Sequence, residues 1–412
     1  MCTRNITAHA RRVARALMGL AVLVGLAACV EPQRNALPDP APDYASAWPV
    51  GFPNARIWGD SAPRAPEVEA VLRREILDLA TGADRRLNVL ALSGGGAEGA
   101  FGAGFLTGWS EGGTRPEFDI VTGVSTGAII APFAFLGAQY DDRLERFYTT
   151  STTSDIVRPT FAAAVFRGAS ALGDTAPLRA VIRRELPSDL ITRIADEHEK
   201  GRRLYIGTTN LDAQRPVIWD IGRIAAYRTP EAEALIRRII LASSAIPVAF
   251  PPVWFDATDG TTVFRELHAD GAVTRNILVF PDDFSRLPAA LRQFPGGTIW
   301  ILHNGQLRPR QDQVTPRTIE IADRSLDTLI KVQTREDITT AISIGRRYGL
   351  RTRMATIPAA YEGHSNAIFD PVYMAGLFQT GRAKALGPSP WFRSLAEFDQ
   401  TLPRPRAPEI PQ

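Results

Sequence analysis

Two apolar runs, each followed by a glycine-containing turn and then by a helix pattern, mark the first third of the chain. Residues 87–92 (LNVLAL) form the first run, and the turn SGGGAEG at 93–99 follows it. Residues 118–124 (FDIVTGV) form the second run, with an apolar helix pattern over 128–136. Strand, turn and helix repeated in this order are typical of parallel α/β units.

Further segments of both kinds continue toward the C-terminus. Strands are predicted at 203–208, 217–220 and 298–302, and helices at 67–80, 230–243 and 321–348. Pro66 directly precedes the first of these helices, and proline is favoured where a helix begins. We therefore expect a three-layer α/β/α fold with a mainly parallel central sheet.

The first 28 residues have the pattern of a secretory signal peptide. Four arginines and no acidic residue are followed by a short apolar segment at 16–25 and by small residues. The apolar run through Val30 is about 15 residues long, which is shorter than the roughly 20 that a spanning helix needs. An ordinary signal peptide cleaved after Ala28, or an uncleaved anchor, fits the same residues.

The residues LAAC at 26–29, followed by a polar and proline-rich stretch, resemble the lipobox of bacterial lipoproteins. The resemblance implies that Cys29 becomes the first mature residue and carries lipid on its thiol and amine, and several acyl chains make a durable anchor. Val30, in place of an Asp after the cysteine, implies the outer membrane of a Gram-negative bacterium. We therefore expect a lipid-anchored protein of the cell envelope.

Composition divides the rest of the chain into four parts. Residues 29–66 are rich in proline and are predicted to form a tether, extended to about Tyr44, after which aromatic side chains such as Trp48 and Trp58 dock on the domain. Residues 67–285 are expected to form the main domain and 286–400 a C-terminal helical extension packed on it. Residues 401–412 are proline-rich and are expected to be loose.

Charge and cysteine usage exclude several classes of function. The formal net charge is +3, but the four arginines of the leader account for it, and the remaining chain has a net charge of −1. No nucleic-acid partner is therefore expected. The chain has two cysteines, Cys2 and Cys29, and five scattered histidines, so neither a disulfide nor a metal site is predicted. No cofactor is expected.

The segment Gly123-Val124-Ser125-Thr126-Gly127 matches the GxSxG pattern of a nucleophile elbow. In such an elbow a sharp turn between a strand and a helix exposes the serine hydroxyl, and only small residues fit on either side, here Gly123 and Gly127. The pattern alone is weak, because a glycine-lined turn with a capping serine has the same sequence. Its position between a predicted strand and an apolar helix favours the catalytic interpretation.

Three successive glycines, Gly94, Gly95 and Gly96, lie 31 residues before Ser125, counted from Gly94. This spacing is about one βα unit, so both turns are expected at the carboxyl ends of neighbouring parallel strands. Glycines leave the backbone amides unobstructed, and ester hydrolysis needs such donors for the oxyanion of its tetrahedral intermediate. A phosphate-binding loop is the alternative, but the GK[ST] ending of that motif is missing.

A third motif, Asp270-Gly271-Ala272, completes a set in the order glycine loop, elbow and Asp-Gly turn. This order resembles the patatin-like phospholipases, and the stretches ASSAIP at 242–247 and IGTTNLDAQR at 206–215 are similar to that family as well. The likeness covers roughly residues 88–280. It implies a dyad in which Ser125 is the nucleophile and Asp270 the base, the amides of Gly94–Gly96 as oxyanion hole, and a lipid or lysolipid ester as substrate.

One position departs from the family pattern. Where the glycine loop of the family usually has Arg or Lys, two residues after its third glycine, this chain has Glu98. The reversed charge puts catalytic efficiency and any preference for anionic headgroups in question.

Two other functions fit parts of the same sequence. An α/β-hydrolase esterase also uses GxSxG but needs a late histidine, for which His303 and His364 are the candidates. A catalytically silent, lipid-anchored envelope protein could keep the fold without the reaction. The apolar run at 161–172 is interpreted either as a lid that contacts the membrane or as core.

Overall fold

The computed structural model describes residues 44, 46–60, 86–159, 171, 173–279, 294, 296–311, 313–365 and 367–402. Within them, ten strands form one sheet: β1 (Trp48–Pro49), β2 (Arg56–Trp58), β3 (Asn88–Leu92), β4 (Ile120–Gly123), β7 (Arg203–Asn210), β8 (Arg215–Asp220), β9 (Val253–Thr258), β10 (Val263–Asp270), β11 (Thr298–His303) and β12 (Arg351–Thr356). Strands β5 (Arg158–Pro159) and β6 (Gly173–Asp174) pair separately.

The helices of the described residues follow the same chain order. They are α3 (Gly99–Glu111), α4 (Thr126–Leu136), α5 (Asp141–Thr150), α6 (Thr153–Ile156), α8 (Ala176–Glu185), α9 (Ser188–Glu199), α10 (Ile221–Ala225), α11 (Pro230–Ser243), α12 (Thr318–Tyr348), α13 (Pro371–Leu386) and α14 (Leu395–Asp399). Short 3-10 turns are η1 (Gly96–Glu98), η2 (Ala138–Tyr140) and η3 (Gly271–Val273).

The sheet is parallel through its centre and antiparallel at one side. Strands β7, β4, β3, β11 and β12 lie side by side in this order, and all four pairings between them are parallel. Strands β8 and β10 pair with β7 antiparallel, and β2, β9 and β1 continue from them. The expected α/β fold with a mainly parallel central sheet is therefore confirmed, with an antiparallel extension added.

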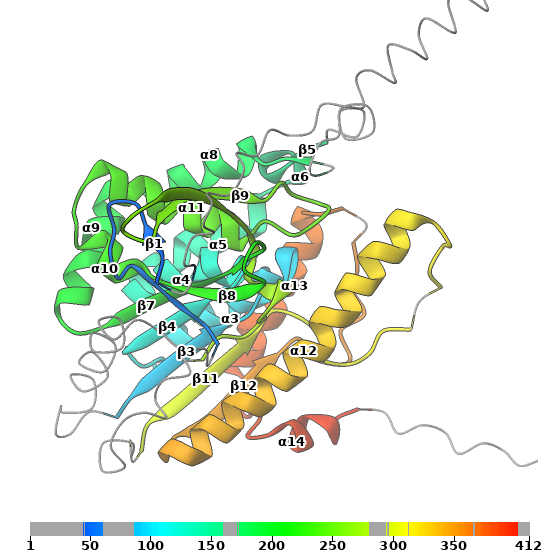
Figure 1. Ribbon diagram of the computed structural model, residues 1–412. Helices are drawn as coiled ribbons and strands as arrows, with labels where there is room; N and C mark the ends of the chain where they lie inside the picture. The colour runs from blue at the N-terminus through cyan, green and yellow to red at the C-terminus, as the bar shows by residue number, and fades with distance from the viewer. Residues whose placement is uncertain are drawn as a thin grey trace, which may run out of the picture.

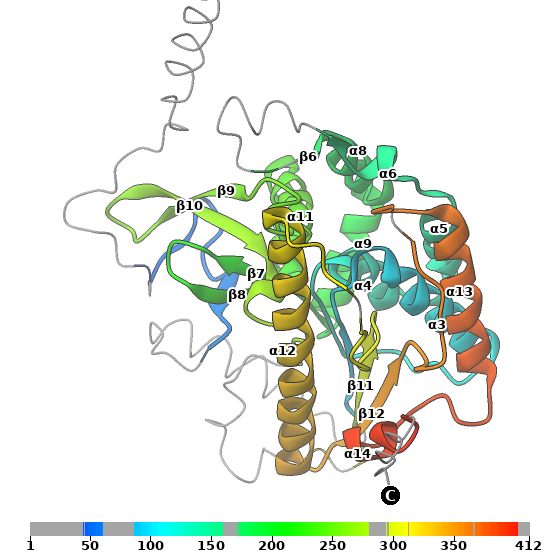
Figure 2. The ribbon, with the colours of Figure 1, turned by 90° about the vertical axis from the view of Figure 1, so that its right-hand side faces the viewer.

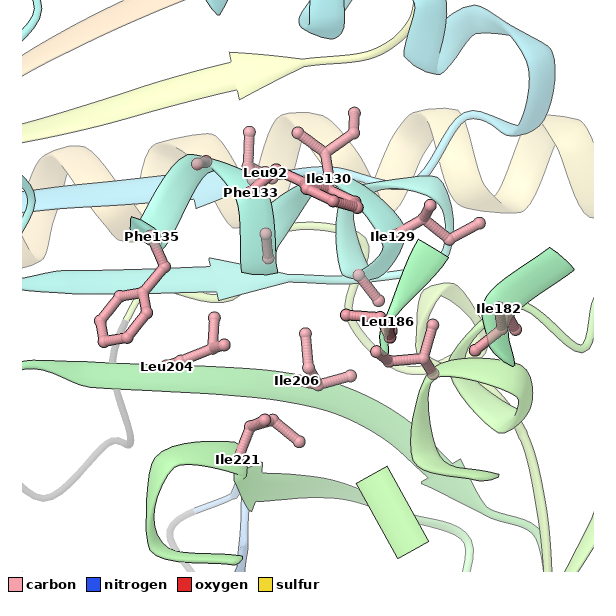
Figure 3. Packing of buried hydrophobic residues seen from close by; sticks show 14 of the residues in the cluster. Leu92, Ile129, Ile130, Phe133, Phe135, Ile182, Leu186, Leu204, Ile206 and Ile221 are labelled. Atoms are coloured by element: carbon pink, nitrogen blue, oxygen red, sulfur yellow. The ribbon is translucent and has the colours of Figure 1, made fainter. Parts of the chain in front are cut away.

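Helices cover both faces of the parallel strands, as Figures 1 and 2 show. On one face, apolar side chains of α3, α4, α9, α11 and α13 form one cluster with alternate strand residues such as Leu90, Leu204 and Ile206. Figure 3 shows Leu204 and Ile206 of β7 among apolar side chains of α4. On the other face, α12 and α14 cover the intervening residues, including Val89 and Tyr205. Strands buried on both faces need apolar residues at successive positions, which explains runs such as NVLAL.

Strand β7 holds two strands end to end along one edge. Gly123 of β4 pairs with Ile206, and Asp270 of β10 pairs with Thr208. Strand β8 occupies the opposite edge over both positions, so β4 and β10 must share the remaining one. Because β4 runs parallel to β7 and β10 runs antiparallel, their carboxyl ends meet. The residues that follow β4 and those that end β10 are thereby brought together.

The C-terminal segment is more than a helical extension. Strand β11 pairs with β3, and β12 with β11, so residues 298–356 supply two strands of the central sheet. The expected boundary at residue 285 therefore does not separate two structural units. Residues 48–58 likewise form β1 and β2, which corrects the C-terminal part of the proposed 29–66 tether and agrees with the expected docking of its aromatic residues.

The remaining sequence expectations divide by what the structure describes. The predicted strands at 87–92, 118–124, 203–208, 217–220 and 298–302 and the helices at 128–136, 230–243 and 321–348 correspond to observed elements, whereas β9, β10 and β12 were not predicted. The leader with Cys29, the helix at 67–80, most of the run at 161–172, and residues 403–412 lie outside the described residues. No helix among the described residues combines the length and apolar character required to cross a bilayer.

Candidate active site

Ser125 occupies a strained turn between β4 and α4. Its backbone has φ 54° and ψ −123°, a conformation that residues with a side chain rarely adopt. The turn is too tight for larger neighbours, because a Cβ atom at Gly123 would overlap the Gly127 carbonyl oxygen and one at Gly127 would overlap that of Leu92. The predicted nucleophile elbow therefore has the expected geometry, with the Ser125 side chain in the pocket described below.

Residues at the end of α11 hold the elbow in place. The Ser125 amide donates to Ser243 Oγ over 2.9 Å, and Ser243 Oγ donates to the Gly207 carbonyl over 2.7 Å. Two residues further along the chain, the Ala245 carbonyl accepts the backbone amide of Asp270 over 2.9 Å. The stretch ASSAIP thus positions Ser125 and Asp270 together. It also uses the Ser125 amide, which is consequently not available for an oxyanion.

Asp270 ends β10 directly beside the elbow, and only 2% of its surface is exposed. Oδ1 accepts the Ala272 amide over 2.8 Å, while Oδ2 has no partner of ordinary hydrogen-bond geometry within the described residues. Burial raises the pKa of Asp270 to about 7, although an interaction with the Ser125 hydroxyl and the Ala272 amide both lower it. The carboxylate is therefore a stronger base than an exposed Asp and has a free oxygen for a proton.

The glycine loop packs directly against the elbow. A Cβ atom at Gly94 would lie 3.1 Å from Ser125 Cβ, and one at Gly95, where φ is 155°, would overlap the Asn304 carbonyl oxygen. The Gly94 amide donates to Asn276 Oδ1 over 3.0 Å. Within the described residues, neither the Gly95 nor the Gly96 amide donates to a protein acceptor. These two amides are therefore available to an oxyanion. The third predicted donor, the Gly94 amide, is already hydrogen-bonded to Asn276.

A pocket of about 380 Å³ contains all of these groups. Ser125, Asp270 and the three glycines line one side of it. A second side comes from α12 and the segment before it, which contribute the residues Arg310, Asp323, Arg324, Leu326, Asp327, Ile330, Lys331 and Thr334. Both apolar and charged side chains therefore line a pocket that contains a serine and a carboxylate, which suits a ligand that has both an apolar and a polar part.

Glu98 also lines the pocket, where Tyr373 donates to it over 3.3 Å. Burial raises the pKa of Glu98 to about 7, against the lowering effect of Arg310 and Lys331. These two cations are not near enough to form an ion pair with Glu98 among the described contacts. The pocket consequently changes its charge near neutral pH at two carboxyl groups, Glu98 and Asp270.

No described histidine forms a hydrogen bond with Ser125 or Asp270. His303 lines the pocket, but its Nδ1 is bonded to Thr356 Oγ1 at 3.0 Å, and burial lowers its pKa to about 3. His364 is exposed and lies beside the Glu362 carbonyl. The histidine that a Ser-His-Asp triad requires is therefore not supplied by either candidate.

The sequence reasoning missed several pocket residues. Asn276, which accepts the Gly94 amide, follows Asp270 by only six residues. Its nearness to the proposed base in the sequence could have indicated that it lies at the site. Arg310 and Lys331, which line the pocket, and Tyr373, which donates to Glu98, had no such signal. Only folding brings α12, the segment before it and α13 to the glycine loop.

A serine on a strand–helix elbow, faced by a buried carboxylate and by glycine amides, is the type of site that hydrolases of α/β fold use. Residues 90–282 match the family model described as patatin-like phospholipase. The family is one of lipid-acting hydrolases. No curated protein matches the sequence. Among solved structures, the chain is similar to VipD from Legionella pneumophila, with 13% identity, a TM-score of 0.33, and coverage of 77% of this chain and 67% of that one.

Proposed function

We propose that this chain hydrolyses acyl esters of membrane lipids or lysolipids through a Ser125–Asp270 dyad. The observation that supports it best is the meeting of β4 and β10 on β7, which sets a strained serine beside a buried carboxylate with a free oxygen. A pocket lined by both apolar and charged side chains suits a lipid ester.

The proposed reaction has two halves. Ser125 Oγ attacks the acyl carbonyl carbon while its proton moves to Asp270, and the Gly95 and Gly96 amides donate to the resulting oxyanion. The tetrahedral intermediate expels the alcohol, which takes the proton from Asp270. A water molecule then gives a proton to Asp270 and attacks the acyl-enzyme, and Ser125 leaves with that proton. The enzyme ends in its starting state, with one fatty acid and one alcohol released.

A fluorophosphonate probe and a lipid panel test the proposal. Wild-type protein should be labelled at Ser125 and should release fatty acid from phospholipid or lysolipid vesicles. Ser125→Ala should lose both signals, whereas Ser343→Ala, which removes an exposed hydroxyl on α12, should keep them. Absent labelling of folded wild-type protein would favour the silent envelope protein, and full turnover by Ser125→Ala would exclude this nucleophile.

We propose further that Cys29 anchors the protein to the outer membrane, next to its substrate, because tethering raises the local concentration of that substrate. The support is the lipobox-like LAAC sequence. Cys29→Ala, expressed in a Gram-negative host, should move the protein from the membrane to the soluble fraction. The matched control is Cys2→Ala, which changes the other cysteine of the leader and should leave the distribution unchanged. Equal membrane association of both variants would exclude the lipid anchor.

A further inference from the structure

Helix α12 lies outside the part of the chain that matches the family, yet it is hydrogen-bonded to a loop that links Asp270 to the glycine loop. This loop, residues 271–277, begins directly after Asp270. The Asn276 and Ile277 amides donate to Asp337 Oδ2 over 2.8 and 3.0 Å, and the Gln333 amide group donates to the Thr274 carbonyl. Three polar contacts from two turns of one helix thus fix the backbone of the loop.

A fourth contact continues from the helix into the glycine loop. Asn276 Nδ2 donates to Thr334 Oγ1 over 2.7 Å, and Asn276 Oδ1 accepts the Gly94 amide over 3.0 Å. Both side chains are buried, with Thr334 exposed to 1% and Asn276 to 3%. The side chain of Asn276 therefore bridges α12 and the loop that carries the proposed oxyanion donors.

The hydroxyl of Thr334 determines which way this amide faces. Thr334 Oγ1 donates its only proton to the Ile330 carbonyl over 2.7 Å, so it can only accept from Asn276. The NH₂ group must consequently face Thr334, and the carbonyl oxygen must face Gly94. A rotated amide would set its NH₂ group against the Gly94 amide, whose remaining acceptor would be the Asn276 backbone carbonyl at 3.4 Å. It would also set its oxygen against Thr334 Oγ1, whose proton is already donated to Ile330.

Fixing Gly94 also fixes its neighbours. Gly94 packs so closely on the elbow that a Cβ atom there would lie 3.1 Å from Ser125 Cβ, and the free amides of Gly95 and Gly96 follow it directly in the chain. A displacement of about 1 Å at a reacting centre typically costs about 100-fold in rate. The orientation of Asn276 is thus linked to the two donors on which the oxyanion depends.

We infer that α12 is a positioning element of the active site, in which Thr334 orients the Asn276 amide and Asn276 fixes the Gly94 peptide of the oxyanion loop. The inference rests on the proposed hydrolase function. Thr334 and Asn276 touch no reacting atom in this scheme. They act through the geometry of Gly95 and Gly96, which bears on the transition state more than on the bound substrate.

The test compares two threonines of the same helix in the full-length protein, with p-nitrophenyl butyrate as the probe substrate. Thr334→Val should lower kcat about 10- to 100-fold while KM changes less than about twofold. Thr339→Val makes the same chemical change at an exposed site whose hydroxyl bonds only its own helix, and it should change neither constant. Thr334→Ser keeps the hydroxyl and should restore most of kcat.

The outcomes separate the inference from the proposed function. Equal kcat values for Thr334→Val and Thr339→Val would overturn the inference alone, as would a Thr334→Ser variant as slow as Thr334→Val. A wild-type protein that neither turns over the ester nor reacts with a fluorophosphonate would overturn the proposed function and the inference with it. If Thr334→Val does not fold, Asn276→Ala replaces it, and an unchanged kcat in that variant counts against the inference.

Discussion

The two sides of the pocket are built by different means. The side that contains Ser125 and Asp270 depends on backbone conformation: a strained turn, glycines that no larger residue can replace, and two strands that meet end to end on β7. The side formed by α12 depends on side chains of a regular helix. These residues differ from other helical residues only in that they line the pocket or form hydrogen bonds with the loop at 271–277. The first side supplies the reacting groups, and the second positions them and sets the charge around them.

The largest effect is expected from Asp270→Asn on the first side. The amide cannot accept the Ser125 proton, so kcat/KM should fall on the order of 10³-fold, within the range that a general base contributes. Ester hydrolysis by purified wild-type and variant protein measures this ratio. A loss of tenfold or less would show that another group accepts the proton.

The same substitution should stabilise the fold. Burial raises the pKa of Asp270 from 3.8 to about 7, so between these pH values the folded chain holds a proton that the unfolded chain releases. The free energy of unfolding of the wild type consequently falls as pH rises through this window. Asn does not ionise, so the variant should be more stable by about 2 to 4 kcal/mol above pH 7 and lose this advantage near pH 4. Denaturant titrations at pH 4 and pH 8 test both values.

The pH dependence of the rate follows from the same carboxyl group. Asp270 must be ionised to act as a base, and burial raises its pKa to about 7. The value of kcat/KM should therefore drop about tenfold per pH unit below 7 and level off above it. Glu98→Gln removes the other pocket carboxyl group with a pKa near 7 and should keep this inflection. Loss of the inflection in that variant would assign it to Glu98 instead.

Much of the first side could be predicted from the sequence, because backbone requirements leave local signals. Gly94–Gly96 and the GxSxG segment are recognisable without knowing the fold. Strand β10 was missed for the opposite reason. Its buried positions include Glu266 and His268, which are hydrogen-bonded to each other. Glu266 also accepts from Arg56, and His268 is hydrogen-bonded to Thr208, partners that only folding brings near. A strand with charged residues facing inward does not show the apolar alternation by which strands are recognised.

The second side illustrates the same limit at α12. Its helical pattern was predicted to within a few residues, but its part in the pocket was not. Thr334 and Asp337 are ordinary helix residues until β11 and β12 place this helix over the loop at 271–277. Helix periodicity indicates which face is buried and gives no indication of which polar group lies against it.

Gly381 of α13 tests whether the packing of this helix on α3 affects the site. A Cβ atom at Gly381 would overlap the Phe101 carbonyl oxygen of α3, so Gly381→Ala must push the two helices apart. Overpacking of this kind costs about 1 to 3 kcal/mol in the free energy of unfolding. The kcat value of the folded variant should stay within about twofold of wild type, since Gly381 is not among the residues that line the pocket. A large fall in kcat with an unchanged melting temperature would contradict this separation.

The smallest effect is expected at Glu98, whose pKa is influenced by cations of the second side. Arg310 and Lys331 lower the pKa of Glu98, but burial raises it more, to about 7, so this side chain is mostly charged at pH 8 and mostly neutral at pH 6. For a lipid with an anionic headgroup, Glu98→Gln should lower KM about threefold at pH 8, as expected for one charge at intermediate distance and dielectric. At pH 6 the two proteins should have nearly equal KM values. A zwitterionic lipid of the same acyl chains is the control, and an equal change for both lipids would mean that Glu98 acts on the shape of the pocket and not on its charge.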